Sequence, residues 1–357
     1  MKRSGLIIVS GLVIGALSIL LMRMGNPASM GVCVACFIRD IAGGLGLHRA
    51  AAVQYLRPEV PGFILGATIV SSITGEFRSR GGSSPIIRFV LGFLMIIGAL
   101  VFLGCPLRMV LRLAAGDLNA LVGLFGFAAG VLVGVVFLRK GFSLGRSTKQ
   151  PRLNGAVMPG LAVTIVVLAV AAPAFVFFSQ SGPGSMHAPL LMSLGAGLVV
   201  GIIAQRSRLC MAGGIRDMFL IKSPHLLVGS LAIIAVALVL NIIGGNFKLG
   251  FEGQPIAHTD GLWNFLGMGL VGLGATLLGG CPLRQCILSG EGDTDAAITV
   301  LGMLAGAAFA HNFGTAASAA GVPVNGKWAV AIGYAIALTI GYLGLPRAEE
   351  GGNRRAA

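Results

Sequence analysis

The sequence predicts an all-α integral membrane protein, and three features of the chain support this fold class. Hydrophobic residues occupy 55% of the 357 positions and charged residues only 11%, whereas a soluble domain carries about 25% charged residues. Apolar stretches extend to about 20 residues, as in a spanning helix. These stretches do not alternate with polar residues, which excludes an outer-membrane barrel. The 56 glycines suit close packing between helices in lipid.

About ten segments are long and apolar enough to be predicted as spanning helices. The first follows Lys2 and Arg3 and resembles a signal peptide, but its apolar run is long and no A-x-A cleavage site follows. We therefore expect an uncleaved helix. In chain order the predicted spans are 4–22, 60–77, 87–103, 118–138, 155–178, 189–205, 226–244, 263–279, 296–311 and 327–345.

Four further segments are too short or too polar to cross the membrane simply, and we expect them to form short re-entrant helices. They hold all six cysteines and much of the charge expected within the membrane. The four segments are 28–48, 105–116, 206–220 and 281–290.

Basic residues predict the orientation, because lysine and arginine concentrate in cytoplasmic loops. This explains the net charge of +14 without nucleic acid. A path of ten spans with both termini in the cytoplasm places nearly all basic loops on that side. They are Lys2 and Arg3, Arg78, Arg80 and Arg88, the segment 139–152, and Arg347, Arg354 and Arg355. The segment 39–57 carries Arg39, Arg49 and Arg57 on the other side, which requires it to fold back or line a vestibule.

The chain contains an internal repeat, indicated by segments that match in the same order. MGVCVACFIRD at 30–40 matches SRLCMAGGIRD at 207–217, and GEFRSRGGSSPI at 75–86 matches GNFKLGFEGQPI at 245–256. LGCPLR at 103–108 matches GGCPLR at 279–284, and Asp117 falls opposite Asp293. Constant order and similar offsets indicate a duplication.

The two copies are predicted to have opposite orientations, because the fifth span adds one crossing between them. The predicted organisation is a first repeat at 1–138, a cytoplasmic basic loop and linking helix at 139–188, a second repeat at 189–311, and a final helix with a cytoplasmic tail at 312–357. In transporters with inverted repeats, broken helices from both halves form the substrate site near the bilayer midplane. We therefore expect the two GCPLR copies to approach a common centre.

The GCPLR sequence predicts the start of a short helix that can attract an anion. Proline is favoured at the first helical position, so Pro106 and Pro282 place Cys105 and Cys281 at the caps. A thiol there meets the positive end of the helix dipole. Arg108 and Arg284 add a second positive group beside free N–H groups. The alternative is that these cysteines are small buried hydrophobes.

The other short segments carry a second symmetric pair of cysteines, Cys33 and Cys210. Each precedes an Ile-Arg-Asp sequence. We expect structural ion pairs at these sequences, because a charge within the membrane needs a partner. The pairs are Arg39 with Asp40 and Arg216 with Asp217.

Cys33 and Cys36 form a C-x-x-C sequence, which is compatible with a redox dithiol or half of a metal site. The second repeat has Gly213 at the position of Cys36, and the first repeat has Val110 at the position of Cys286. The histidines fit no metal spacing. No nucleotide, metalloprotease or hydrolase motif is present. We therefore predict neither a metal, a cofactor nor an enzymatic activity.

With both GCPLR segments, the repeat and the cysteine-bearing short segments, nearly the whole chain resembles the YeeE/YedE family, which includes thiosulfate uptake proteins. The segment 30–62 is similar to the selenium-metabolism-associated YedE branch. This resemblance implies an hourglass of spanning helices pinched by short helices, in which pore cysteines relay a sulfur oxyanion through S–H···S hydrogen bonds. Carried onto this chain, the relay cysteines are Cys33 or Cys36, Cys105 and Cys281, with Cys210 as the symmetric fourth.

The leading hypothesis is an inner-membrane permease of a bacterium for a small sulfur- or selenium-containing anion such as thiosulfate. Family association adds a soluble TusA-like or rhodanese-like sulfur carrier as a partner. The second hypothesis is a membrane redox or sulfur-transfer protein that uses the Cys33/Cys36 dithiol. A soft-metal transporter would need facing thiolates or Met/His clusters, and an inert structural protein would not need symmetric polar residues in the membrane.

Overall fold

The computed structural model describes residues 3–346, and within them the chain is almost entirely helical. Lys2, Arg347, Arg354 and Arg355, which the orientation prediction used, lie outside the described residues. The long helices are α1 (Arg3–Arg23), α3 (Glu59–Ile73), α4 (Pro85–Phe102), α6 (Leu118–Arg139), α7 (Arg152–Ala171), α8 (Leu190–Ser207), α10 (His225–Ile243), α11 (Gly261–Leu277), α13 (Thr294–Asn312) and α14 (Val324–Leu343).

Four short helices lie between the long ones, each directly after a long helix or its connecting loop. They are α2 (Val34–Gly44), α5 (Pro106–Ala114), α9 (Met211–Leu220) and α12 (Pro282–Gly290). A 3₁₀ turn, η1 (Ala51–Val53), follows α2, and the strands β1 (Arg80–Gly81) and β2 (Thr148–Lys149) pair antiparallel.

The helices confirm the prediction of an all-α, multi-pass membrane protein. Nine helical stretches within residues 3–346 are long and apolar enough to cross a membrane. The one predicted span that is not among these nine, 60–77, is α3, which has 15 residues. At about 1.5 Å of rise per residue this helix is shorter than the hydrocarbon core of a bilayer. It ends because Thr74 caps it and Gly75 turns the chain at a φ of +68°.

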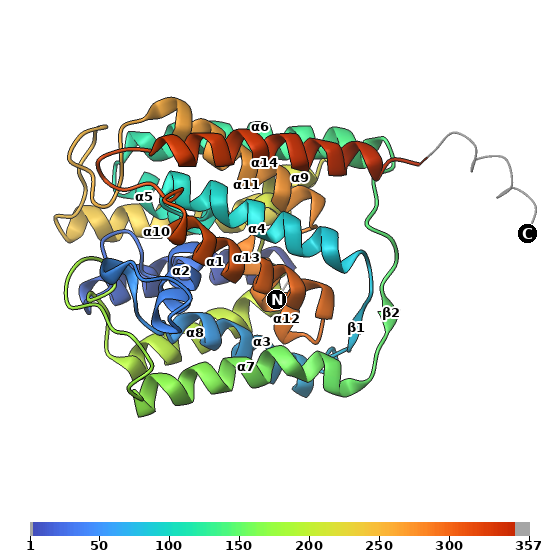
Figure 1. The fold of residues 1–357 in the computed structure, drawn as a ribbon, viewed down its shortest axis with the longest axis horizontal. Helices are drawn as coiled ribbons and strands as arrows, with labels where there is room; N and C mark the ends of the chain where they lie inside the picture. The colour runs from blue at the N-terminus through green and yellow to red at the C-terminus, as the bar shows by residue number, and fades with distance from the viewer. Residues whose placement is uncertain (1–2, 347–357) are drawn as a thin grey trace, which may run out of the picture.

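The long helices pack in pairs that join early and late parts of the chain. Helix α3 packs against α8, α1 against α10, α4 against α13, and α6 against α11, while α4 also contacts α11. In Figure 1, α7 runs along the lower edge of the bundle and α6 and α14 along the upper edge. The connection from α6 to α7 passes along one end of the bundle, where β2 lies beside β1.

Glycines allow the closest of these helix contacts. A Cβ on Gly130 of α6 would overlap the backbone carbonyl oxygen of Gly269 in α11. We expect Gly130→Ala to lower stability by about 1–3 kcal/mol, the usual cost of overpacking, because backbone rather than a flexible side chain blocks the methyl group. Thermal unfolding of purified protein measures this loss. Gly160→Ala in α7, which meets nothing within 4 Å, should unfold like the wild type; equal stability of both variants would contradict the packing argument.

Two loops form backbone hydrogen bonds with the turns that follow the short helices α5 and α12. The N–H of Arg78 donates to the carbonyl of Glu291 at 2.9 Å, and the N–H of Lys248 donates to the carbonyl of Ala115 at 2.9 Å. The next pair of bonds joins Arg80 to Gly292 and Gly250 to Gly116. Each loop therefore adds an extended segment beside the start of the following long helix, α13 or α6.

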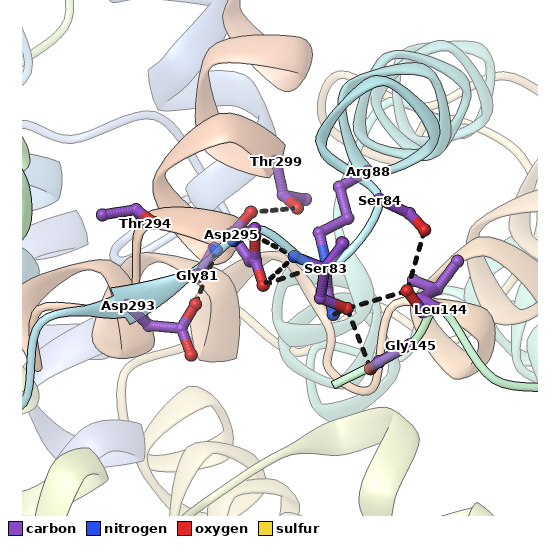
Figure 2. A network of polar contacts seen from close by, with 12 residues as sticks. Gly81, Ser83, Ser84, Arg88, Leu144, Gly145, Asp293, Thr294, Asp295 and Thr299 are labelled. Atoms are coloured by element: carbon purple, nitrogen blue, oxygen red, sulfur yellow. Dashed lines mark hydrogen bonds and ion pairs between the residues drawn. The ribbon is translucent and has the colours of Figure 1, made fainter. Parts of the chain in front are cut away.

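The loop before α4 is held by Asp295, as Figure 2 shows. The Asp295 carboxylate accepts the N–H of Gly82 at 2.9 Å and that of Ser83 at 3.2 Å. The Ser83 hydroxyl in turn donates to the carbonyls of Leu144 and Gly145 in the connection to α7. This network joins the loop before α4 to the start of α13 and to the connection that leads to α7.

Candidate functional site

Four cysteines occupy the N-cap positions of the four short helices. They are Cys33 for α2, Cys105 for α5, Cys210 for α9 and Cys281 for α12. Pro106 and Pro282 stand in the first turns of α5 and α12, where a missing N–H has no cost. The Cys33 and Cys210 side chains act as caps, because their sulfurs accept the N–H groups of Cys36 at 3.4 Å and Gly213 at 3.3 Å.

These cap cysteines contact one another in two pairs. The Sγ atoms of Cys33 and Cys105 lie 3.8 Å apart, within hydrogen-bond range for sulfur, and the N–H of Cys281 donates to Cys210 Sγ at 3.4 Å. All four side chains are buried. Each GCPLR cysteine thus meets the cap cysteine of its own half. Among the hydrogen bonds of residues 3–346, none joins Cys105 to Cys281, and the approach of the two GCPLR copies to a common centre stays a prediction.

Arg108, three residues after Cys105, has a completely buried side chain. Its guanidinium donates to the carbonyls of Leu103 and Ile256, the second at 3.1 Å, and Nη1 lies 3.9 Å from Cys36 Sγ. Ile256 belongs to the loop before α11 and has a φ of +49°, in the left-handed region that a branched residue rarely adopts. The loop therefore brings a carbonyl directly over the arginine.

The second pair borders an open cavity of about 580 Å³, which we call the arginine cavity. Arg284 lines it, whereas its counterpart Arg108 is completely buried. The charged residues and the thiol that define the cavity are Arg78, Arg80, Arg208, Arg216, Arg284, Glu76, Glu291 and Cys210. Five arginines and two glutamates line the cavity, and Asp293 and Asp217 form ion pairs with Arg80 and Arg216. The remaining excess of positive charge makes the cavity attractive to anions. The cavity thus offers an anion access to one of the two thiol pairs.

The two glutamates of the arginine cavity are bound mainly by Arg208. Its Nη1 lies 2.9 Å from Glu291 Oε1 and its Nη2 lies 2.7 Å from Glu76 Oε2. Arg284 Nη1 donates to the same Glu291 oxygen at 3.1 Å. A hydrogen bond from Gln205, with the nearby arginines, lowers the pKa of Glu76. Arg208 therefore joins the start of α9 to the loop before α4 and to the end of α12.

The Arg-Asp neighbours of the two halves differ in burial. Asp40 is fully buried and accepts from Arg39 at 2.7 Å and from Arg57 at 2.8 Å. Arg216 and Asp217 lie 2.8 Å apart but remain partly exposed. Arg57 also donates to the carbonyls of residues 183 and 186. Arg39 and Arg57 thus share one buried carboxylate inside the protein, so these two residues of the basic segment 39–57 are not loop charges exposed to solvent.

The two remaining cysteines, Cys36 and Cys286, do not occupy N-cap positions. Cys36 follows the cap of α2 and contacts Leu103 O at 4.0 Å and Arg108. Cys286 is buried within α12. Within residues 3–346, histidine, cysteine, aspartate and glutamate side chains form no group placed to hold a metal ion.

The sequence analysis did not identify Arg208, Glu291 or Glu76 as residues of the site. The internal repeat carried a usable signal: Glu291 falls opposite Ala115, and Arg208 falls opposite Gly31. Charges that appear in only one half of a duplication mark where the halves have diverged.

Comparisons with known proteins point to sulfur transport. A family described as "Sulphur transport" matches residues 206–345. A segment of 111 residues is 32% identical to the thiosulfate transporter TsuA of Escherichia coli (strain K12), covering 30% of this chain and 30% of that protein. A segment of 253 residues is 26% identical to the uncharacterized MFS-type transporter EfpA of Mycobacterium tuberculosis (strain ATCC 25618 / H37Rv), covering 68% of this chain and 39% of EfpA. The matches thus span well under two thirds of either relative.

Proposed function

We propose that the protein is a permease for a small sulfur- or selenium-containing anion. The match of residues 206–345 to the sulphur-transport family, together with the similarity to the E. coli transporter, supports the resemblance of this chain to the YeeE/YedE family. The thiosulfate transport named for the E. coli relative makes thiosulfate the first candidate. The observation that carries the proposal is that four cysteines occupy the N-cap positions of four short helices and contact one another in two pairs.

Thiols at these positions suit an anion with a soft, polarisable terminal sulfur or selenium. A thiol is a weak donor and a weak acceptor, and the helix ends add a partial positive charge. Conduction requires binding that is favourable enough for entry and weak enough for release. In this mechanism the anion enters the arginine cavity, contacts Cys210 and Cys281, and passes to Cys33 and Cys105, with Arg108 moving aside.

We also propose that the two halves form an inverted repeat with an hourglass-shaped pathway. The sequence repeat pairs α1 with α8, α3 with α10, α4 with α11, and α6 with α13. If each helix is replaced by its counterpart, the α3–α8 contact becomes the α10–α1 contact, and the α4–α13 contact becomes the α11–α6 contact. All four contacts are present. Under this relation α2, α5, α9 and α12 are the re-entrant helices, and the two thiol pairs are equivalent.

The arginine cavity faces the cytoplasm in this proposal. The basic connection 139–152 and the loop with Arg78 and Arg80 lie at the same end of the bundle (Figure 1), and such residues favour the cytoplasmic side of an inner membrane. Both termini then lie in the cytoplasm. A soluble TusA-like or rhodanese-like carrier would exchange sulfur with the permease at this face.

The test is uptake into proteoliposomes of thiosulfate, selenosulfate, sulfite and selenite, with and without a proton gradient, against protein-free liposomes. We expect thiosulfate and selenosulfate to enter at least about tenfold faster than sulfite, a barrier difference of about 1.4 kcal/mol, because sulfite lacks a terminal sulfur or selenium. Equal rates for thiosulfate and sulfite would contradict a pathway built on sulfur contacts.

The alternative is a redox or sulfur-transfer protein that uses the Cys33/Cys36 dithiol. The N–H of Cys36 donates to Cys33 Sγ, and Cys105 Sγ lies 3.8 Å from the same sulfur, so three cysteines gather there. This alternative predicts a reversible disulfide, and equal loss of function in Cys33→Ala and Cys36→Ala. The permease predicts uptake without formation of any disulfide during turnover, which thiol labelling under transport conditions would measure.

A further inference from the structure

Glu291 occupies a position that helix stability does not explain. It is the C-cap residue of α12, and a negative charge at a helix C-terminus is unfavourable. The equivalent residue after α5 is Ala115, which caps α5 with the same type of backbone bonds. A carboxylate is therefore not needed to end this helix, and its presence requires another reason.

The Glu291 carboxylate receives two guanidinium groups on one oxygen. Arg208 Nη1 and Arg284 Nη1 lie 2.9 Å and 3.1 Å from Oε1. The Glu291 side chain is only 6% exposed although it lines the arginine cavity. Two converging guanidinium groups are also the arrangement that binds the oxygens of a sulfonate, sulfate or phosphate. Cys210 lines the same cavity.

We propose that Glu291 is an exchangeable internal anion: its carboxylate holds Arg208 and Arg284 while the arginine cavity is empty, and the oxygens of the incoming sulfur oxyanion displace it. The terminal sulfur of the bound anion then faces Cys210. The identity of the anion rests on the proposed function, whereas the exchange itself requires only an anion that carries such oxygens.

The exchange gives this site a moderate affinity. Two unoccupied arginines beside a thiol would hold a dianion tightly, and a conduit needs release as well as entry. Arg208 keeps its bond to Glu76 at 2.7 Å when Glu291 leaves. Among the ion pairs of the described residues none involves Arg78, which lines the same cavity and can receive the displaced carboxylate. In the other half, the guanidinium of Arg108 is bound by backbone carbonyls and not by a carboxylate that an anion could displace.

The test is the dissociation constant of thiosulfate and of sulfate for the purified full-length protein, measured by calorimetry for wild type and Glu291→Gln. We expect the variant to bind both anions about tenfold more tightly. Hydrogen bonds to a charged group are stronger than those to a neutral one, so an amide holds Arg208 and Arg284 less tightly than the carboxylate does and is easier for the anion to displace. Glu252→Gln, an exposed residue outside the cavity, is the matched control and should bind like the wild type. In proteoliposomes Glu291→Gln should saturate at lower thiosulfate and turn over more slowly.

Unchanged or weaker binding in a folded Glu291→Gln protein would overturn the inference. Glu291→Ala provides a second variant that folds if the first does not, because alanine stands at the equivalent position of the first half; it too should bind more tightly. Tighter binding with no uptake by any variant would leave the exchange supported and contradict the permease. Normal uptake with unchanged affinities would contradict the exchange alone.

Discussion

Cys105→Ala is expected to slow thiosulfate uptake about tenfold while leaving the protein folded. The Cys105 sulfur lies 3.8 Å from that of Cys33 at the buried end of the proposed pathway. Its side chain makes no capping hydrogen bond to α5, so alanine removes the sulfur without removing a cap. Cys281→Ala should act in the same way, because Cys281 also caps without a side-chain bond. Losing one favourable sulfur contact of about 1.4 kcal/mol slows passage about tenfold.

Cys286→Ala is the matched control for both variants. Cys286 is fully buried, as Cys105 and Cys281 are, but lies inside α12. Uptake per folded protein, measured in proteoliposomes, should remain near the wild-type rate for Cys286→Ala alone. Wild-type uptake by Cys105→Ala would remove this thiol from the pathway. Equal losses of uptake in all three variants would indicate that the substitutions disturb packing, and that the loss does not come from a missing sulfur contact.

Asp40→Asn is expected to destabilise the protein by about 3–5 kcal/mol, because removing one partner of a buried ion pair leaves the other charge uncompensated. Here two arginines lose their partner at once. Arg39 donates twice to Oδ1, and Arg57 donates to Oδ2 at 2.8 Å. Arg57 also ties the connection before α8 to this centre. Thermal unfolding and the yield of monodisperse protein measure the effect.

The second half supplies the control for this prediction. Asp217 stands at the same position of the repeat, but its side chain is 17% exposed and that of Arg216 is 25% exposed. Water compensates such a pair when it is broken, so Asp217→Asn should cost at most about 1 kcal/mol. Equal destabilisation by the two substitutions would show that burial does not determine the role of these pairs.

Hydropathy and helix signals in the sequence were sufficient for the all-α fold, because long apolar stretches have few alternatives in a membrane. The two GCPLR sequences correctly indicated where α5 and α12 begin, since proline fixes the first turn. The length of α3 was overestimated at 60–77. The predicted span continued to residue 77, but Thr74 and Gly75 end the helix after Ile73 through local backbone geometry that a hydropathy average does not register.

The site was only partly predictable from the sequence. The repeat identified the cysteines, but it does not specify which of them touch, because that depends on how the short helices pack. The sequence predicted only Arg39 as the partner of Asp40. It did not identify the second partner, Arg57, which is 17 residues away along the chain. Arg208 and Glu291 are 83 residues apart, and only the fold brings them together beside Cys210.

Crystals of the protein with bound selenosulfate, measured at the selenium absorption edge, test the central claim most directly. The anion passes from thiol to thiol in this account, so its soft terminal atom should give an anomalous peak in contact with Cys210 and Cys281 or with Cys33 and Cys105. Selenium peaks confined to surfaces remote from all four cap cysteines, in crystals where the anion is bound, would contradict it.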